Sequence, residues 1–157
     1  MAEVPENAGE KTVPQEQIGI QSIYVKDISF ESPNVPKIFS ERSAPKFELE
    51  MANHIKRVAE NIYEVVLHVT ATAKAEETTA YLVEIHQAGL FMLTGFAENK
   101  LSYMLNGVCP NILFPYAREM ISTLITRGGF QPLFLAPVNF EALYLQRLSQ
   151  NQAEQKN

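Results

Sequence analysis

The residues that could do chemistry in this chain are few and widely spaced. The histidines His54, His68 and His86 are separate in the sequence, and two of them fall on strand faces that we expect to be turned to solvent. No His-x-x-x-His pair occurs, and no cysteine lies close to a histidine, so the spacing of a metal site is missing. We therefore expect no bound metal and no general base at these positions.

Nucleophilic and nucleotide chemistry are equally poorly supported. Cys109 is the only cysteine, and it precedes Pro110 among apolar residues with no neighbouring base or cation to activate it. Gly128-Gly129 ends an apolar periodic segment instead of opening one, so a phosphate-binding loop is missing. We expect a protein that is not an enzyme and has no cofactor. The enzymatic alternative would need a closed polar pocket around Cys109 or a histidine.

Length and charge narrow the classes further. A chain of 157 residues suits a single domain. The formal net charge of −5 disfavours nucleic acid as a partner, because phosphate binding needs a basic face, and it favours basic partners. No apolar run approaches the length of about 18 residues that spans a membrane, so we expect no direct membrane insertion.

The two ends of the chain are polar. Residues 1–17 are rich in glutamate and lack the basic start and apolar centre of a secretory signal. We therefore expect a disordered N-terminal tail at 1–17, a single domain at 18–150 and a flexible C-terminal tail at 151–157. The expected location is cytoplasmic.

Four segments have the residue period of β-strands, at 24–31, 47–51, 62–72 and 78–95. In the second of these, Phe47, Leu49 and Met51 alternate with charged residues, which is the pattern of a half-buried strand. The polar segment 53–61 is expected to hold a turn. Short connections without a βαβ rhythm predict an antiparallel sheet that is wetted on one face.

The remainder of the chain favours helices. A short helix is predicted over 98–105, ended by Asn106-Gly107. Pro110 and Pro115 are tolerated only in a first helical turn, so we expect 109–119 to open irregularly and the regular helix to run from Pro115 to Arg127. Gly128-Gly129 would end that helix, and Asn139 would cap a last helix that reaches Gln150. The fold class is α+β, a four-stranded antiparallel sheet with helices packed on one face.

Large apolar side chains crowd two proline-rich connectors, 32–45 and 130–138. These side chains either fold back to complete the core of a thin two-layer domain, or line a groove that holds an extended, unfolded segment. Proline stiffness suits the second interpretation, because a preordered wall loses less entropy on binding. From these residues alone both interpretations stay open.

Three motifs carry a family resemblance: KDISFE at 26–31, CPNILFPYARE at 109–119 and LAPVNF at 135–140. In order and spacing they resemble the SecB family of bacterial protein-export chaperones, and the similarity extends over residues 20–148. The resemblance implies an ATP-independent holdase that binds unfolded precursor proteins and delivers them to the SecA translocation motor. It also implies a homotetramer, a dimer of dimers in which the helices lie between two sheets.

The resemblance assigns two surfaces on this chain. Client proteins would bind an apolar groove made by the loop after the first strand, the second strand, the last connector and the last helix. The residues are Ile38, Phe39, Phe47, Leu49, Leu133, Leu135, Phe140 and Tyr144. A basic, zinc-carrying segment of SecA would bind the acidic sheet face at Asp27, Glu31, Leu82 and Glu84.

A SecB-like chaperone dedicated to a single client, such as an antitoxin, is the alternative function. The intact acidic residues Asp27, Glu31 and Glu84 favour the general role, since a dedicated chaperone has less need of a SecA surface. The chain departs from the family pattern near Ser43, where relatives usually carry a tryptophan, because it contains no tryptophan at all.

Overall fold

The computed structural model describes residues 12–156 of the chain. Its strands are β1 (Gln17–Glu31), β2 (Lys46–Ala59), β3 (Ile62–Ala75) and β4 (Thr78–Thr94), and its α-helices are α1 (Glu98–Tyr103), α2 (Cys109–Arg127) and α3 (Phe140–Gln155). A short 3-10 helix, Lys37–Ser40, follows β1, and a π-helical segment, Met104–Val108, joins α1 to α2. The expected α+β class is confirmed. Residues 1–11 of the expected tail lie outside the described residues.

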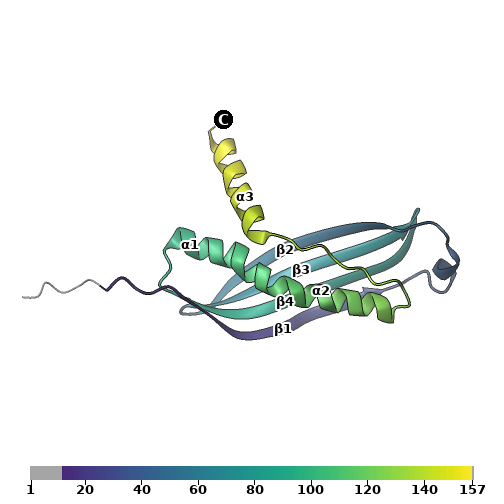
Figure 1. Ribbon diagram of the computed structural model, residues 1–157, viewed down its shortest axis with the longest axis horizontal. Coiled ribbons are helices and arrows are strands. Elements are labelled where there is room, and N and C mark those ends of the chain that lie inside the picture. The colour runs from purple at the N-terminus through teal and green to yellow at the C-terminus, as the bar shows by residue number, and fades with distance from the viewer. Residues whose placement is uncertain (1–11, 157) are drawn as a thin grey trace, which may run out of the picture.

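The strands form one antiparallel sheet in the order β1-β4-β3-β2 (Figure 1). Tight turns at Glu60-Asn61 and Glu76-Glu77 join β2 to β3 and β3 to β4, and Asn61 and Glu76 adopt φ angles of 59° and 54°. The loop after β1 instead crosses to the far edge of the sheet, so β1 and β2 are both edge strands. The register of these pairs decides which side chains share a face.

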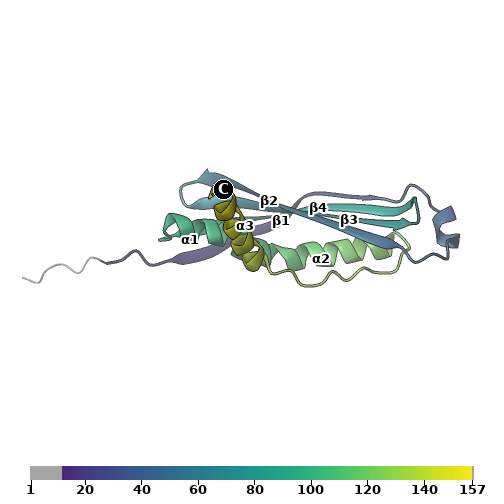
Figure 2. The same ribbon diagram turned by 90° about the horizontal axis from the view of Figure 1, so that it is seen from above.

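Helices cover only one face of the sheet. Figures 1 and 2 show α1 and α2 following one another along the sheet, whereas α3 projects away from it. On the covered face, β3 presents the fully buried Val65, Leu67 and Val69. Alternate residues of β3, such as His68 and Thr70, lie on the other face and are half-buried. We call these the helix-side face and the open face.

The hydrophobic core lies between the helix-side face and α2. α2 contributes Leu113, Ala117, Ile121 and Ile125, which recur every four residues and are fully buried. This stripe is the one that the helical period predicts. Each large aliphatic side chain in such a core contributes about 2 kcal/mol through burial. Among residues 12–156, every helix is too short or too polar to cross a membrane.

The strands are longer than their sequence pattern predicts. β1 begins at Gln17, and β2 continues to Ala59 through the segment in which we expected a turn. Residues 54–59 of β2 are exposed. An edge strand without cover on either side needs no apolar alternation, so the hydrophobic period carries no signal there.

The expected start of the long helix is wrong. α2 begins at Cys109, with Pro110 in its first turn and Pro115 inside the helix. Pro110 directly follows the π-helical segment, in which the N–H of Cys109 donates to the carbonyl of Met104, so it lies where the helical hydrogen-bond pattern changes. Pro115 removes a single bond to the carbonyl four residues before it. Gly107 does not end a helix either. A Cβ at Gly107 would lie 3.0 Å from the Cα of Glu141, so the glycine allows α3 to approach closely.

The end of α2 follows the prediction. The N–H of Gly129 donates to the carbonyl of Thr126 at 3.0 Å, and the N–H of Phe130 donates to the carbonyl of Ile125 at 3.2 Å. This pair of bonds is the Schellman motif. Gly129 has a φ of +87°, which a side chain would disfavour.

The expected N-terminal cap of α3 is also confirmed, but the helix is longer than predicted. The side chain of Asn139 accepts a hydrogen bond from the N–H of Ala142 at 3.0 Å. The helix then continues to Gln155, past the predicted end at Gln150. Residues 151–155, which we expected to form a flexible tail, therefore continue the helix.

Candidate functional site

A hollow of about 520 Å³ lies on the helix-side face at the start of β2. It forms where the loop after β1 meets the connector after α2. Its lining is largely apolar and includes Ile38, Phe39, Pro45, Phe47, Ala75, Ala80, Tyr81, Phe130 and Pro132. We call it the first hollow.

Aromatic rings build the wall of the first hollow. The centroid of Phe130 lies 5.0 Å from that of Tyr81 and 5.2 Å from that of Phe39, and Phe30 lies 6.1 Å from Tyr81. These spacings are favourable for aromatic pairs. Tyr81 is buried, and its burial raises the pKa of its hydroxyl to about 12. Phe39 is 52% exposed, so this series of contacting rings ends in one that is open to a ligand.

The glycines after α2 allow this packing. A Cβ at Gly128 would lie 2.3 Å from the Cζ of Phe30, and one at Gly129 would lie 3.2 Å from the Cζ of Phe39. The Schellman turn at Gly129 also turns the chain so that Phe130 follows directly against the sheet. Helix termination and the shape of the first hollow therefore depend on the same two residues.

A second hollow, of about 140 Å³, lies farther along β2, where α3 begins. Its lining includes Met51, Ala52, Asn53, Leu67, Asn106, Phe140, Leu143, Tyr144 and Arg147. The hydroxyl of Tyr144 donates to Oγ of Ser102 at 2.7 Å, and the amide of Asn53 donates to the carbonyl of Leu105 at 3.1 Å. The first bond connects α3 to α1, and the second connects β2 to the π-helical segment between α1 and α2.

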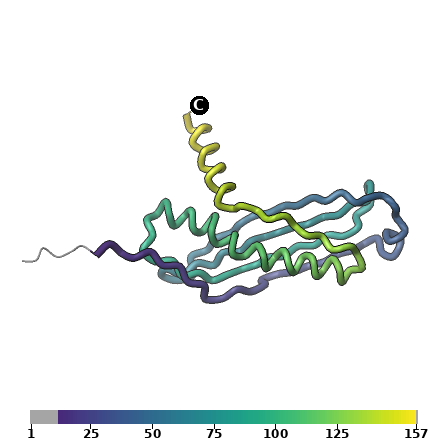
Figure 3. Tube along the Cα trace, in the orientation of Figure 1, coloured from purple at the N-terminus to yellow at the C-terminus, as the bar shows by residue number. Residues whose placement is uncertain are grey.

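The helix-side edge of β2 connects the two hollows. Phe47, Leu49 and Met51 occupy alternate positions there, opposite Ala73, Ala71 and Val69 of β3. Phe47 is 51% exposed and Leu49 is 41% exposed. The connector 128–139 returns along α2 toward α3 on the same side of the sheet (Figure 3). The first hollow, this edge and the second hollow form what we call the apolar groove.

The structure brings most of the expected client-binding residues to the apolar groove. Ile38, Phe39 and Phe47 line the first hollow, Phe140 and Tyr144 line the second, and Leu49 lies between them. Three of the eight are buried: Ile38 at 6%, Leu135 at 9% and Phe140 at 7% exposure. These three side chains therefore support the walls of the groove and leave little surface for a client to contact.

Leu133 and Leu135 stand apart from both hollows. Leu133 is half-buried against the core, and Leu135 lines a separate shallow depression beside Arg118 and Ser122 of α2. Sequence reasoning did not assign Tyr81 and Phe130 to the site, although both lie on its wall. The sequence shows Tyr81 on an apolar strand face and Phe130 in the proline-rich connector, but it does not show that these two residues meet.

The expected SecA-binding residues form a continuous patch on the open face. In the register of β1 and β4, Asp27 faces His86, Ser29 faces Glu84 and Glu31 faces Leu82. Asp27 and Glu31 are exposed, and Leu82 and Glu84 are half-buried. We call Asp27, Glu31, Leu82 and Glu84 the acidic patch. It lies on the side of the sheet opposite to the apolar groove.

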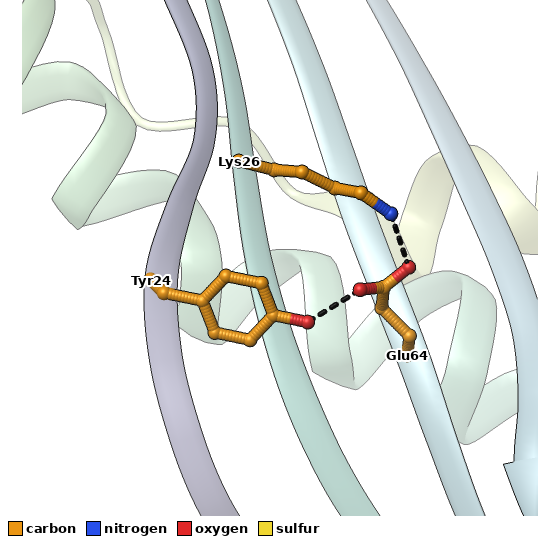
Figure 4. Close-up of polar contacts among 3 residues, drawn as sticks. All are labelled: Tyr24, Lys26 and Glu64. Atoms are coloured by element: carbon orange, nitrogen blue, oxygen red, sulfur yellow. Dashed lines mark hydrogen bonds and ion pairs between the residues drawn. The ribbon is translucent and has the colours of Figure 1, made fainter.

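The carboxylate of Glu64 on the open face is already neutralised. Glu64 on β3 accepts hydrogen bonds from the hydroxyl of Tyr24 and, at 2.7 Å, from Nζ of Lys26 (Figure 4). The bonds from Lys26 and Tyr24 lower the pKa of the Glu64 carboxyl. Burial, with the bond to Glu64, raises the pKa of Tyr24 to about 12. Glu64 therefore adds little free negative charge to the open face.

The histidines are not separate in the fold. The rings of His68 and His86 stack with centroids 3.6 Å apart and an interplanar angle of 3°, and His54 lies 4.2 Å from His68. They come from β2, β3 and β4 and cross the open face in one line, which we call the histidine row. Nε2 of His86 lies 2.7 Å from Oε1 of Glu84 in the acidic patch. The sequence-based expectation that they are isolated is wrong.

The thiol that could act as a nucleophile is not activated. Cys109 is fully buried, and burial raises the pKa of its thiol to about 12, which disfavours the nucleophilic thiolate. Within residues 12–156, no group of three or more His, Cys, Asp or Glu side chains is arranged to hold a metal ion. The arrangement provides two surfaces, one apolar and one acidic, on opposite faces of a sheet.

The sequence comparisons agree with the motifs. A family model described as "Preprotein translocase subunit SecB" matches residues 11–151. The chain is similar to the Protein-export protein SecB of Nitrosococcus oceani, with 55% identity covering 88% of this chain and 86% of that protein. The corresponding protein of Methylococcus capsulatus is 50% identical, with 92% and 95% covered. That of Marinobacter nauticus is 48% identical, with 98% and 93% covered.

Among solved structures, the fold is similar to that of a SecB-like chaperone from Mycobacterium tuberculosis in complex with a ChAD peptide from the HigA1 antitoxin. The TM-score is 0.65, over 77% of this chain and 90% of that chain, at 18% sequence identity. At that identity the likeness shows a shared fold.

Proposed function

The chain belongs to the SecB family of protein-export chaperones, and we propose that it holds unfolded precursor proteins along the apolar groove and delivers them to SecA through the acidic patch. Relatives of about half-identical sequence carry the name Protein-export protein SecB, which supports this general role over one dedicated to a single client.

The observation that carries the proposal is the exposure of large apolar side chains along one edge of a covered sheet. Phe39, Phe47 and Leu49 are each more than 40% exposed although they adjoin the core. Neighbouring exposed apolar side chains of this kind often mark a site that binds another protein. An extended apolar segment is the chemistry that matches a groove of this shape.

The energetics suit reversible binding of a client protein. One client side chain that buries ~100 Å² gains ~2.5 kcal/mol before ordering costs are subtracted. A single contact of this kind is too weak to retain a chain. Several contacts along one flexible client multiply through effective concentration, so affinity rises with the number of hollows that are filled. The sequence offers no phosphate loop, and the proposed capture needs no ATP.

Delivery is proposed to use the acidic patch. Asp27, Glu31 and Glu84 concentrate negative charge around the apolar side chain of Leu82, which suits a basic segment of SecA. Because the patch and the groove lie on opposite faces, a client and SecA can be bound at the same time.

We further propose that the protein acts in the cytoplasm as a homotetramer, a dimer of dimers, built from a single domain at residues 18–150. Helices on one face and projecting α3 leave apolar side chains, such as Leu143 at 40% exposure, for contacts between subunits. Sedimentation or light scattering tests this directly, and a mass of one chain would contradict it.

One experiment separates the two surfaces. The double substitution Asp27→Lys and Glu84→Lys should abolish SecA binding and leave the protein's suppression of precursor aggregation unchanged. The double substitution Phe39→Ser and Phe47→Ser should do the reverse. If each pair impairs both activities equally, the division into two independent surfaces is wrong.

A further inference from the structure

The histidine row occupies the centre of the open face. His68 on β3 is the direct cross-strand partner of His86 on β4, and the imidazole rings of this pair are parallel. His54, from β2, lies diagonally next to His68. Three titratable rings in contact therefore span three of the four strands.

The row continues into the acidic patch. On the fourth strand, β1, Asp27 is the direct partner of His86. Glu84, two residues from His86 on the same face, contacts its ring nitrogen at 2.7 Å. Two of the three carboxylates of the patch are thus neighbours of one imidazole, so any charge on His86 acts on the patch at short range.

Other charged groups around the row come from all four strands. They are Lys26 and Asp27 from β1, Glu50 and Lys56 from β2, Glu64 from β3 and Glu84 from β4. Lys26 and Glu64 neutralise each other through their 2.7 Å ion pair. The net charge around Asp27 and Glu84 therefore depends mainly on whether the row is protonated.

Histidine is the side chain whose charge changes most readily between pH 5 and pH 8. Burial, and then the positive charge that His86 and His54 can acquire, lowers the pKa of His68. Acidification can therefore add positive charge to a row of imidazoles that lies next to Asp27 and Glu84.

We propose that the histidine row is a proton-operated control on the acidic patch. With neutral imidazoles, the patch presents its negative charge and docks a basic segment. With protonated imidazoles, the same surface carries compensating positive charge and releases that segment. This inference rests on the proposed docking of SecA at the acidic patch, and it adds the condition under which docking is strong.

The test compares the native chain with the variant His54→Gln/His68→Gln/His86→Gln. Dissociation constants are measured at pH 7.5 and 5.8, at fixed ionic strength and without added metal, for two probes: purified SecA and an oligolysine peptide. Native protein should lose about tenfold or more of its affinity for each probe, since each linked proton contributes up to tenfold per pH unit. The affinity of the glutamine variant for each probe should fall by less than about threefold between the same two pH values.

His86→Lys provides a matched counterpart, because it fixes a positive charge in the row. At pH 7.5 this variant should bind both probes as weakly as native protein does at pH 5.8, while His86→Gln should not. If the triple variant folds poorly, this pair carries the same comparison. Retained suppression of precursor aggregation, which uses the opposite face, verifies that each variant is folded.

The outcomes separate this inference from the proposed function. Equal losses of affinity on acidification in native and glutamine proteins would overturn the proton control, even where SecA binds well at pH 7.5. A native protein that binds oligolysine in a histidine-dependent way but does not bind SecA would support the control and contradict the docking of SecA.

Discussion

Phe39 lies against Phe130 with ring centroids 5.2 Å apart, although one follows β1 and the other follows α2. Neither residue belongs to the sheet or to a long helix. Their contact, together with Tyr81 behind them, shapes the first hollow and leaves Phe39 52% exposed. One end of the apolar groove therefore exists only when two connectors meet.

Replacing Phe47 by serine should weaken the capture of an unfolded precursor. The side chain is 51% exposed on the groove, and removing its apolar surface should raise the Kd by roughly five- to thirtyfold, or about 1–2 kcal/mol. Val58→Ser is the matched control, since Val58 is 47% exposed on the same strand but lies outside both hollows. Fluorescence titration with a labelled precursor measures both, and equal effects would contradict the assignment of the groove.

The sequence carried enough information to predict the groove's ingredients but not its geometry. Apolar residues in proline-rich connectors are visible without coordinates, and so is the alternation of Phe47 and Leu49. Which of them are walls and which are surface depends on how the connectors dock. That is why Ile38, Leu135 and Phe140, expected as contacts, are buried.

Gly129→Ala should destabilise the protein by about 1 kcal/mol, because residue 129 has a φ of +87° that alanine disfavours. The new Cβ would also lie 3.2 Å from the Cζ of Phe39 and disturb the first hollow. Gly19→Ala on β1 is the control, since a Cβ there meets Met92 at 3.4 Å, an ordinary contact. Urea denaturation compares the midpoints. Equal shifts in the two variants would exclude a conformational role for Gly129.

The histidine row shows what strand pairing adds to sequence reasoning. In the sequence, His68 and His86 are far apart, and a polar segment obscured the end of β2. The turns at 60–61 and 76–77 alone would place His68 opposite Ile85. A β-bulge near the end of each hairpin shifts the register by one residue, and this shift puts His68 opposite His86 and beside His54. We placed the first turn too broadly, so that register was out of reach.

Glu64→Gln should reduce stability at pH 7 by about 1 kcal/mol, because the carboxylate loses its charged bond to the half-exposed Lys26. The folded-state pKa of Glu64 lies below its ordinary value of 4.5. The stabilisation is therefore present above pH 4.5 and is lost as the pH falls through the lowered pKa. The free energies of unfolding of the native protein and the variant should therefore become equal in acid. Glu50→Gln, without an ion pair among the described residues, should show no such convergence.

His68→Gln should flatten the dependence of stability on pH. Burial and the neighbouring imidazoles lower the pKa of His68 below 6.5, so the unfolded chain binds the proton first as the pH falls. Native protein should therefore lose stability from about pH 6.5 downward until the folded state is also protonated. The variant should lose less over that range in thermal melts. A steeper loss in the variant would contradict the lowered pKa.

Tyr144→Phe tests how α3 is held. The hydroxyl of Tyr144 donates to Oγ of Ser102 at 2.7 Å, a side-chain bond between α3 and α1. Its loss should destabilise the start of α3 by about 1 kcal/mol and speed amide exchange there.

Ser102→Ala removes the same bond from the other partner, so the double variant should be no less stable than either single one. The coupling should be confined to α3: exchange in β3, which is buried between β2 and β4, should stay unchanged. Strictly additive losses would mean that Tyr144 and Ser102 act independently. In that case Phe140, buried at 7% exposure and packed on Phe114 with ring centroids 5.6 Å apart, would be the main anchor of the helix and of the second hollow.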